Sequence, residues 1–315
     1  MAIRKDLRIF IPSLTSYTEV VGFGLYSSGV ALINVFYNSA PQVFLARMLD
    51  FTAVGIYSRA VTVTQVFDKL VTQVISPVIM PAICAQTSAG ADLKRIYLHA
   101  ISLLTALHWP FLIFMAAMAK PLIFVWLGPS WLEVVPLIQL LCLGYLSLFA
   151  ACLTYPVLIA AGSVRDTLLS SLISLPPSLL IIVIASFFGV KAVAASTLLT
   201  LPFQAAVAIY FISRHLDLRV ADLVRATRKS AVVMLCSGTV AVLCAALVEY
   251  NVIGPLVGIV VAGIAVGVAW LAALIAVRHP LLSELEAPAN RVLSVLSRFA
   301  GGAPDAAART DRDLC

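Results

Sequence analysis

The chain has 315 residues, of which 62% are apolar and only 11% are charged, and its mean hydropathy is +1.04. Soluble domains usually hold about 45–50% apolar and about 25% charged residues, so this composition excludes a cytosolic enzyme, a secreted disulfide scaffold and a disordered protein. The formal net charge of +6 would suit nucleic acid, but the positions of the basic residues favour a membrane protein instead. We expect an all-α, polytopic membrane helix bundle.

Apolar stretches of about 20 residues, long enough to cross a bilayer as a helix, predict about eight transmembrane helices. Their approximate bounds are 21–45, 54–80, 96–118, 134–161, 167–188, 192–211, 231–248 and 253–277. A short apolar stub at 121–127 extends the third stretch and ends at a predicted Gly-Pro-Ser-Trp turn, 128–131. The outer loops are all short, which places the activity within the membrane or at its cytoplasmic face.

The Lys and Arg residues predict the orientation, because cytoplasmic loops retain basic residues. With the N-terminus inside, most of the 21 Lys and Arg residues fall in cytoplasmic segments, and the outer loops hold only Arg47, Lys120 and Lys191. An even number of helices returns the C-terminus to the same side. We therefore expect both termini to be cytoplasmic and no nucleic-acid partner.

The second predicted span carries a stripe of polar side chains at the spacing of one helix face. Its members are Ser58, Thr62, Gln65, Lys69, Thr72 and Ser76. A lysine at mid-bilayer costs at least about 2.5–3.5 kcal/mol on insertion scales, so the stripe should avoid lipid. It either packs against neighbouring helices or lines a water-filled cavity. A second polar seam on the first span, made of Ser27, Asn34, Asn38 and Gln42, favours the cavity.

Three basic residues are predicted at different depths of the bilayer. Lys69 lies near the middle, Arg59 nearer the outer surface and Arg47 in the turn between the first two spans. Cationic groups with access to water attract phosphate or diphosphate, and arginine can bind two oxygens at once. The alternative for Arg47 and Arg59 is a snorkelling position at the interface. The sequence has no phosphate loop, nucleophile elbow, carboxylate pair or metal cluster, so we expect no enzyme activity, metal or cofactor.

Several stretches, read in order, resemble a known family. They are 22–28 (GFGLYSS), 38–49 (NSAPQVFLARML), 54–60 (VGIYSRA), 121–123, 127–131 and 161–166. Their order and spacing resemble the bacterial polysaccharide-flippase branch of the multidrug/oligosaccharidyl-lipid/polysaccharide exporter superfamily. One departure is Pro41 and Gln42, where similar relatives often show an acidic or amide pair, so no coupling-ion role is carried over to that place.

The resemblance implies a domain organisation. Family members typically have two six-helix lobes, often followed by two more helices, and flip undecaprenyl-linked oligosaccharides by alternating access. This chain resembles only the second part: 1–20 a cytoplasmic connector, 21–211 a six-helix C-terminal-type lobe, 212–230 a basic cytoplasmic loop, 231–277 two additional helices and 278–315 a cytoplasmic tail. A truncated gene product, a mis-called start and a half-transporter that needs a partner are the open alternatives.

The resemblance also implies a function in the bacterial inner membrane, the flipping of undecaprenyl-diphosphate-linked oligosaccharide for surface polysaccharide. Lys69 and Arg59, with Arg47 above them, would bind the diphosphate, and Gln65, Thr62, Asn34 and Asn38 would contact water and sugar hydroxyls. The expected partners are the lipid-linked oligosaccharide, the bilayer, and a missing N-terminal lobe or polysaccharide-assembly proteins. The alternatives are a multidrug exporter of the same superfamily, with Asp68 as its intramembrane carboxylate, and an inactive membrane remnant. A membrane glycan polymerase would need a large outer loop, which the sequence lacks.

Overall fold

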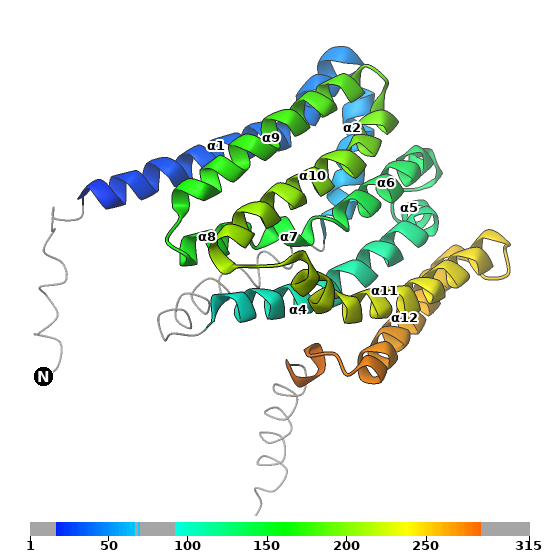
Figure 1. Cartoon of the computed structure of the whole chain (residues 1–315). Coiled ribbons are helices and arrows are strands. Elements are labelled where there is room, and N and C mark those ends of the chain that lie inside the picture. The colour runs from blue at the N-terminus through cyan, green and yellow to red at the C-terminus, as the bar shows by residue number, and fades with distance from the viewer. Residues whose placement is uncertain (1–16, 67–68, 70–91, 285–315) are drawn as a thin grey trace, which may run out of the picture.

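The described part of the chain is helical and contains no strand (Figure 1). The computed structural model describes residues 17–66, 69 and 92–284. Its elements are α1 (Tyr17–Met48), α2 (Phe51–Thr64), α4 (Leu93–Ala117), α5 (Ala119–Trp126), the 3-10 helix η2 (Pro129–Val134), α6 (Val135–Tyr145), α7 (Phe149–Cys152), α8 (Thr154–Ala160), α9 (Val164–Ser186), α10 (Val190–Leu216), α11 (Val220–Glu249) and α12 (Pro255–Val277). The predicted all-α helix bundle is confirmed.

The long helices pack in an order that differs from their order in the chain (Figure 1). Across the bundle the neighbours run α1, α9, α10, α6, α4, α11 and α12, each in contact with the next. Helix α2 packs against α6 and α1, and α5 packs against α12. The segments at the two ends of this row, α1 and α12, therefore lie far apart, and α10 and α6 lie at its middle.

Five described helices are long and apolar enough to cross a membrane, namely α4, α9, α10, α11 and α12. The bent unit from η2 to α8 raises the number to as many as six. These six correspond to the last six predicted spans. The first predicted span is helical throughout in α1, and most of the second beyond α2 lies outside the described residues. The chain is a multi-pass membrane protein, and the number eight stays a prediction.

The predicted continuous span 134–161 is wrong in detail, because the chain there divides into α6, α7 and α8 with a bend of 52°. The indole N–H of Trp109 donates to the carbonyl oxygen of Leu146 (2.9 Å), in the turn that separates α6 from α7. The next turn uses tighter i to i+3 bonds, such as Leu148 N–H to the Tyr145 oxygen. Pro156 has no N–H to continue the ladder beyond α7.

The second predicted helix also differs, because α2 ends at Thr64 with a turn at Gln65. The hydroxyls of Thr62 and Thr64 donate to carbonyls four residues earlier, at 2.8 and 2.9 Å. Such bonds from Thr to its own helix tend to bend it. Arg47, predicted in the connecting turn, lies in the last turn of α1, since α1 continues to Met48.

The predicted basic loop 212–230 is mostly helical. Helix α10 runs to Leu216 and ends where Asp217 adopts a left-handed conformation with φ +47°. Helix α11 begins at Val220, and the Asp222 carboxylate accepts a hydrogen bond from the Arg219 backbone N–H (3.2 Å). This carboxylate satisfies a backbone donor at the helix start, so the basic residues after it project from α11 rather than from a loop.

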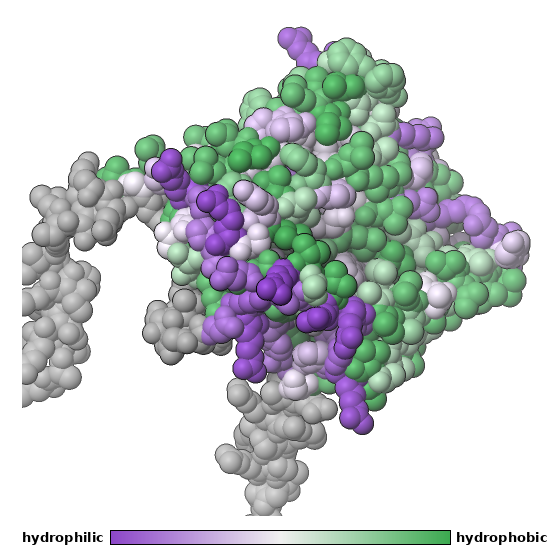
Figure 2. Space-filling view, viewed as in Figure 1, coloured by the Kyte–Doolittle hydropathy of each residue, from purple (hydrophilic) through white to green (hydrophobic). Residues whose placement is uncertain are grey.

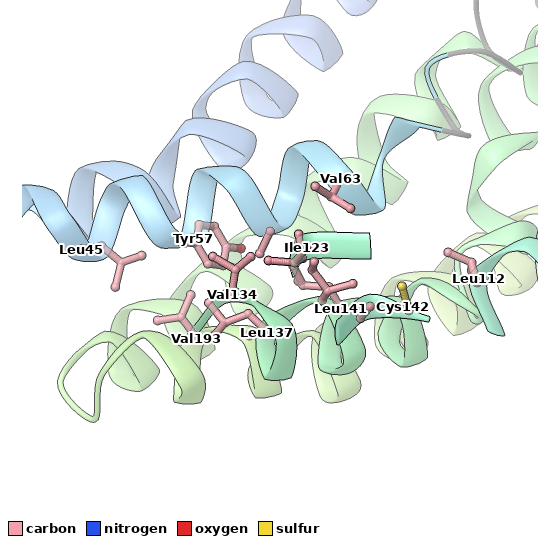
Figure 3. Close-up of a cluster of buried hydrophobic side chains, with 14 of the residues drawn as sticks. Leu45, Tyr57, Val63, Leu112, Ile123, Val134, Leu137, Leu141, Cys142 and Val193 are labelled. Carbon is pink, nitrogen blue, oxygen red and sulfur yellow. The ribbon is translucent and has the colours of Figure 1, made fainter. Parts of the chain in front are cut away.

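One cluster of buried hydrophobic side chains holds the α2, α5, α6 and α10 region together (Figure 3). In Figure 3, Tyr57 and Val63 from α2 lie over Val134, Leu137 and Leu141. The other labelled members are Leu45, Leu112, Ile123, Cys142 and Val193. This cluster supports the side of the bundle on which the polar helix faces converge.

The surface exposes large apolar side chains that a soluble protein would bury, and small polar residues lie at several helix contacts. Large apolar side chains such as Leu243, Ile264 and Ile275 are more than half exposed, and Figure 2 shows wide hydrophobic areas on the face it displays. Small hydroxyl residues lie buried between helices, as Ser174 and Thr200 do. Lipid-facing hydrocarbon outside and small polar residues at helix contacts are typical of membrane bundles.

A buried histidine joins the end of α12 to α4 and α11. His279 is 2% exposed, and its Nδ1 accepts the Leu281 backbone N–H (3.1 Å). The proton therefore sits on Nε2, which lies 3.3 Å from the Ser102 hydroxyl and 3.2 Å from the Ser230 hydroxyl. Burial, followed by the charges of Lys229 and His99, lowers the pKa of His279 from 6.5 to about 4.

This histidine predicts an acid-sensitive fold. Between pH 6.5 and 4 the unfolded chain binds a proton at His279 that the folded chain does not, so this contribution to stability is complete above 6.5 and falls as the pH is lowered. We expect the thermal-unfolding midpoint in detergent to drop between about pH 7 and about pH 4.5, and His279→Gln to weaken that dependence. Equal pH slopes for the variant and the unaltered chain would contradict this role.

Candidate functional site

A cavity of about 550 Å³ lies among α1, α2, α6, α9 and α10. Its polar lining comes from helices that are distant in the chain. Those residues are Asn34, Tyr37, Asn38 and Gln42 of α1, Tyr57 of α2, Gln65 and Lys69 after α2, Tyr145 of α6, and Thr197 and Gln204 of α10. Apolar side chains such as Val61, Leu175 and Ile182 complete the wall. A concave, partly apolar cavity with a few convergent polar groups is a typical ligand site.

The face of α1 in the cavity follows helical spacing. Asn34, Tyr37, Asn38 and Pro41 are three or four residues apart, so they lie along one side of the helix. The Asn34 amide also donates to the carbonyl oxygen of Val30 (2.8 Å). Asn38 and Gln42 line the cavity and are also exposed, so the cavity is open to the surroundings of the described structure on this side.

The part of the second span that faces the cavity agrees with the predicted stripe at Gln65 and Lys69 and differs from it by one position in α2. Tyr57, Val61 and Gln65 line it at intervals of four residues, followed by Lys69. Ser58 and Thr62 do not line it. The difference of one position arises because Tyr57 is drawn into the hydrophobic cluster against α6, which sets the rotation of α2 about its axis.

Two glutamines link the cavity's tyrosines to other helices. The Gln65 side-chain amide donates to the Tyr145 hydroxyl (2.7 Å), which connects the end of α2 to α6. The Gln204 amide donates to the Tyr37 hydroxyl (2.8 Å) and to the Ser178 hydroxyl (3.2 Å), which connects α10 to α1 and α9. Each amide still has acceptor capacity on its oxygen, so both can serve a ligand as well as the fold.

Lys69 is the cation of this cavity. Its side chain lines the wall, is exposed, and follows a turn in which its backbone N–H donates to the Gln65 oxygen (3.0 Å). Among the described residues that line the cavity, none is Asp or Glu. The described residues also hold no group of three or more His, Cys, Asp or Glu side chains that could bind a metal. The polar groups of the described lining are thus mainly amides, phenols and the ammonium group of Lys69.

The structure brings together four of the seven residues predicted to bind substrate, namely Asn34, Asn38, Gln65 and Lys69. Their role as ligands stays a prediction. Thr62 is exposed and bonds the Ser58 carbonyl instead. Arg59 lies away from the cavity, with its guanidinium carbon 5.8 Å from the centre of the Trp131 ring, and Arg47 is exposed at the end of α1. Thr72, Ser76 and Asp68 lie outside the described residues.

The tyrosines of the cavity and the contributions of α6 and α10 were not predicted from the sequence. Tyr37 could have been found, because it falls three residues after Asn34 and one before Asn38 on the same polar seam. Tyr145 and Gln204 could not, since they lie 80 and 167 residues from the partners Gln65 and Tyr37 that hold them. Ser27, predicted on the same seam, contacts the Tyr155 hydroxyl (2.7 Å) instead of the cavity.

Comparisons with known proteins point to one kind of family. A family model described as "Polysaccharide biosynthesis protein" matches residues 2–136. A relative named "Uncharacterized membrane protein in cps region", from Klebsiella pneumoniae, is 24% identical over 122 residues, which are 39% of this chain and 25% of that protein. No solved structure matches. The matched region thus spans about a quarter of the curated relative, and both findings support the predicted polysaccharide flippase-type family.

The Gln204 link yields a stability prediction. Replacement of Gln204 by leucine removes the donor to Tyr37 and Ser178 at similar side-chain volume, so we expect a loss of about 1–3 kcal/mol and a lower thermal-unfolding midpoint. Gln139→Leu is the matched control, because the Gln139 amide is exposed and makes one longer bond to the Ala116 carbonyl (3.3 Å). Equal midpoints for the two variants in the same detergent would show that the link does not hold the cavity wall.

Proposed function

We propose that this chain, whose matches support a polysaccharide flippase-type family, helps to move a lipid-diphosphate-linked oligosaccharide across the bacterial inner membrane during assembly of a surface polysaccharide. The proposed role is transport rather than catalysis. The lipid carrier is undecaprenyl diphosphate in the family that the sequence resembles. The single observation that carries the proposal is the composition of the cavity wall around Lys69.

Amide and phenol groups suit a sugar. Every sugar hydroxyl can donate and accept, and the side chains of Asn34, Asn38 and Gln65 also offer both donors and an acceptor. The rings of Tyr37 and Tyr145 add flat apolar surface beside their hydroxyls. A volume of about 550 Å³ lies within the usual range of ligand pockets, about 300–1,000 Å³. The wall therefore supports an uncharged, hydroxyl-rich group as the larger part of the cargo.

Lys69 supports an anionic group next to that sugar. An ammonium group acts as a compact point charge for phosphate oxygens, and bonds between charged partners are stronger than neutral ones. In the described wall no carboxylate competes for this cation, and none is present to bind a cationic drug. The described wall therefore suits an oligosaccharide diphosphate, while Asp68, the carboxylate that the multidrug alternative would use, lies outside the described residues. Arg59, engaged with Trp131, is not part of the proposed site.

The open side of the cavity supports a further protein surface as part of the working transporter. Asn38 and Gln42 are polar, lie on a helix of a membrane protein, and are exposed in the described chain. Polar side chains in a bilayer normally face water or protein rather than lipid. We therefore propose that another lobe or partner chain completes the cavity, with the cargo held between the two.

Substitution of Lys69 tests the function. In the native host, with the gene replaced at its own locus, Lys69→Ala should weaken diphosphate binding by about tenfold, the value of one charge-assisted hydrogen bond, and lower the surface polysaccharide. Lys69→Arg, which keeps the charge, should retain most of the polymer. Lys191→Ala is the matched control, since Lys191 is exposed at the start of α10 and does not line the cavity. Normal polymer with normal protein level in Lys69→Ala would refute the cation's role.

The proposed orientation, with both termini in the cytoplasm, has its own test. The outer loops hold few basic residues, which supports this direction of insertion. A protease-sensitive tag at the C-terminus should be removed in inverted inner-membrane vesicles and protected in right-side-out spheroplasts. Removal of the tag in spheroplasts would place the C-terminus outside and contradict the proposed orientation.

A further inference from the structure

A second and larger cavity, of about 970 Å³, lies where α4 and α11 begin and the chain leaves α12. The basic side chains that line it are Lys94 and Arg95 in the first turn of α4, and Arg225 and Lys229 in the second and third turns of α11. Leu98, Ser102 and Pro280 form part of its remaining wall. Among the described residues, none lines both this basic cleft and the cavity around Lys69.

The charges of the basic cleft are only partly balanced by carboxylates. Lys94 is neutralised, because its ammonium group lies 2.7 Å from the Asp222 carboxylate. Lys229 donates to the carbonyl oxygen of Arg278 (2.9 Å), an uncharged partner that leaves its positive charge in place. Arg95 and Arg225 form no ion pair or hydrogen bond with another described side chain. The Asp222 carboxylate, already paired with Lys94, also attracts Arg225 electrostatically. In the described part of the chain, three cations therefore face one cavity with only this shared carboxylate to balance them.

The other ionisable groups at the cleft do not change this balance. The Asp92 carboxylate, which lines the cleft, accepts the Lys94 backbone N–H (2.9 Å) as the N-cap of α4. His99 also lines the cleft, and its ring lies 3.6 Å from Glu284. These carboxylates serve a helix end and a histidine, so the guanidinium groups of Arg95 and Arg225 remain available to an anion.

The position of Arg95 is itself unfavourable without an anion. A positive charge in the first turn of a helix opposes the helix dipole, whose N-terminal end is positive. Like charges on α11 face it across the cleft, from a segment 130 residues later in the chain. An anion held between the two helices would relieve both interactions, since it would attract the dipole and every cation around it.

The cleft lies at the depth of lipid head groups. It is formed by the first turns of α4 and α11, two helices long and apolar enough to cross a membrane, and the ends of spanning helices are where hydrocarbon gives way to the interface. Figure 2 shows hydrophilic side chains gathered over the region where α4 and α11 begin, beside hydrophobic surface. Basic pockets between membrane helices at this depth suit the phosphate groups of anionic lipids.

We propose that the basic cleft binds the phosphate head group of an anionic membrane lipid between Arg95, Arg225 and Lys229. The general tendency of basic residues to gather at one membrane face explains positive charge near these helix ends. That tendency alone does not explain why basic side chains of α4 and α11 converge on one cavity. The proposal does not depend on the function proposed above, because the described linings of the two cavities share no residue and the binding test needs no transport.

The experiment compares two double variants that each remove two positive charges. Arg95→Gln with Arg225→Gln removes two cations of the cleft. Arg214→Gln with Arg228→Gln removes two exposed arginines of α10 and α11 that do not line it. The full chain is purified in detergent, and retained lipid is measured by native mass spectrometry after addition of phosphatidylglycerol or, as the neutral probe, phosphatidylcholine.

We expect the unaltered chain to retain phosphatidylglycerol over phosphatidylcholine, and the cleft variant to bind it about tenfold or more weakly, since each cation near a lipid phosphate contributes about one kcal/mol, a factor of about five. The control variant should stay within about twofold. Equal losses in both double variants, or no loss in the cleft variant, would overturn the proposal.

Parallel arms with a polyprenyl diphosphate and with inorganic pyrophosphate identify the source of the phosphate. Stronger retention of the polyprenyl diphosphate than of phosphatidylglycerol also supports a lipid site and identifies an isoprenoid lipid as the source of the phosphate, whereas binding of pyrophosphate alone, without either lipid, overturns a lipid site.

A measurement on the unaltered chain covers the case in which the cleft variant does not fold. Short-chain phosphatidylglycerol should raise the thermal-unfolding midpoint, and phosphatidylcholine of the same chain length should not. The rise should weaken when salt is increased from about 0.05 M to about 0.5 M, because exposed charges are screened. Equal effects of the two lipids would count against a phosphate site.

Discussion

Close contact between helices in a hydrocarbon solvent is the constraint on which the rest of this structure depends. Lipid tails are as apolar as leucine, so burial of leucine does not by itself bring two membrane helices together. Here small residues permit the approach. A Cβ added to Gly144 of α6 would lie 2.7 Å from the Thr197 hydroxyl of α10. Between α4 and α11, the Thr105 hydroxyl donates to that of Ser230 (2.9 Å).

The polar cavity is a consequence of that packing. Helix α10 lies between α9 and α6, and its glutamine, Gln204, reaches Tyr37 on α1 through the same interface that buries Ser178. The hydrophobic cluster around Tyr57 sets the rotation of α2, and this rotation points Gln65 toward Tyr145. Amides and phenols that would be costly in lipid therefore satisfy one another while leaving acceptor atoms at the wall. Rigid support of this kind can hold the polar groups of a candidate binding site in place.

The two cavities differ in their position along the helices and in the charge of the side chains that line them. Among the described residues, the one around Lys69 is lined by one cation and by neutral groups. The basic cleft holds several cations at helix ends, next to the buried link that His279 forms with Ser102 and Ser230. Ser102 belongs to both the cleft and the link, so the position of α12's end is coupled to the wall of the cleft.

The sequence by itself determined the class of fold and the polar side of the first helix. Runs of apolar residues long enough to cross a bilayer specify helices whatever their neighbours are, because an unpaired backbone group in hydrocarbon is costly. The spacing from Asn34 to Asn38 likewise specifies one helix face. Only the tertiary structure decided that Arg59 binds an aromatic ring rather than the cavity, that α6 breaks where Trp109 takes a carbonyl, and that Gln204 completes the site. Those outcomes depend on contacts between helices distant in the chain, and the period of a single helix carries no information about which partner lies opposite it.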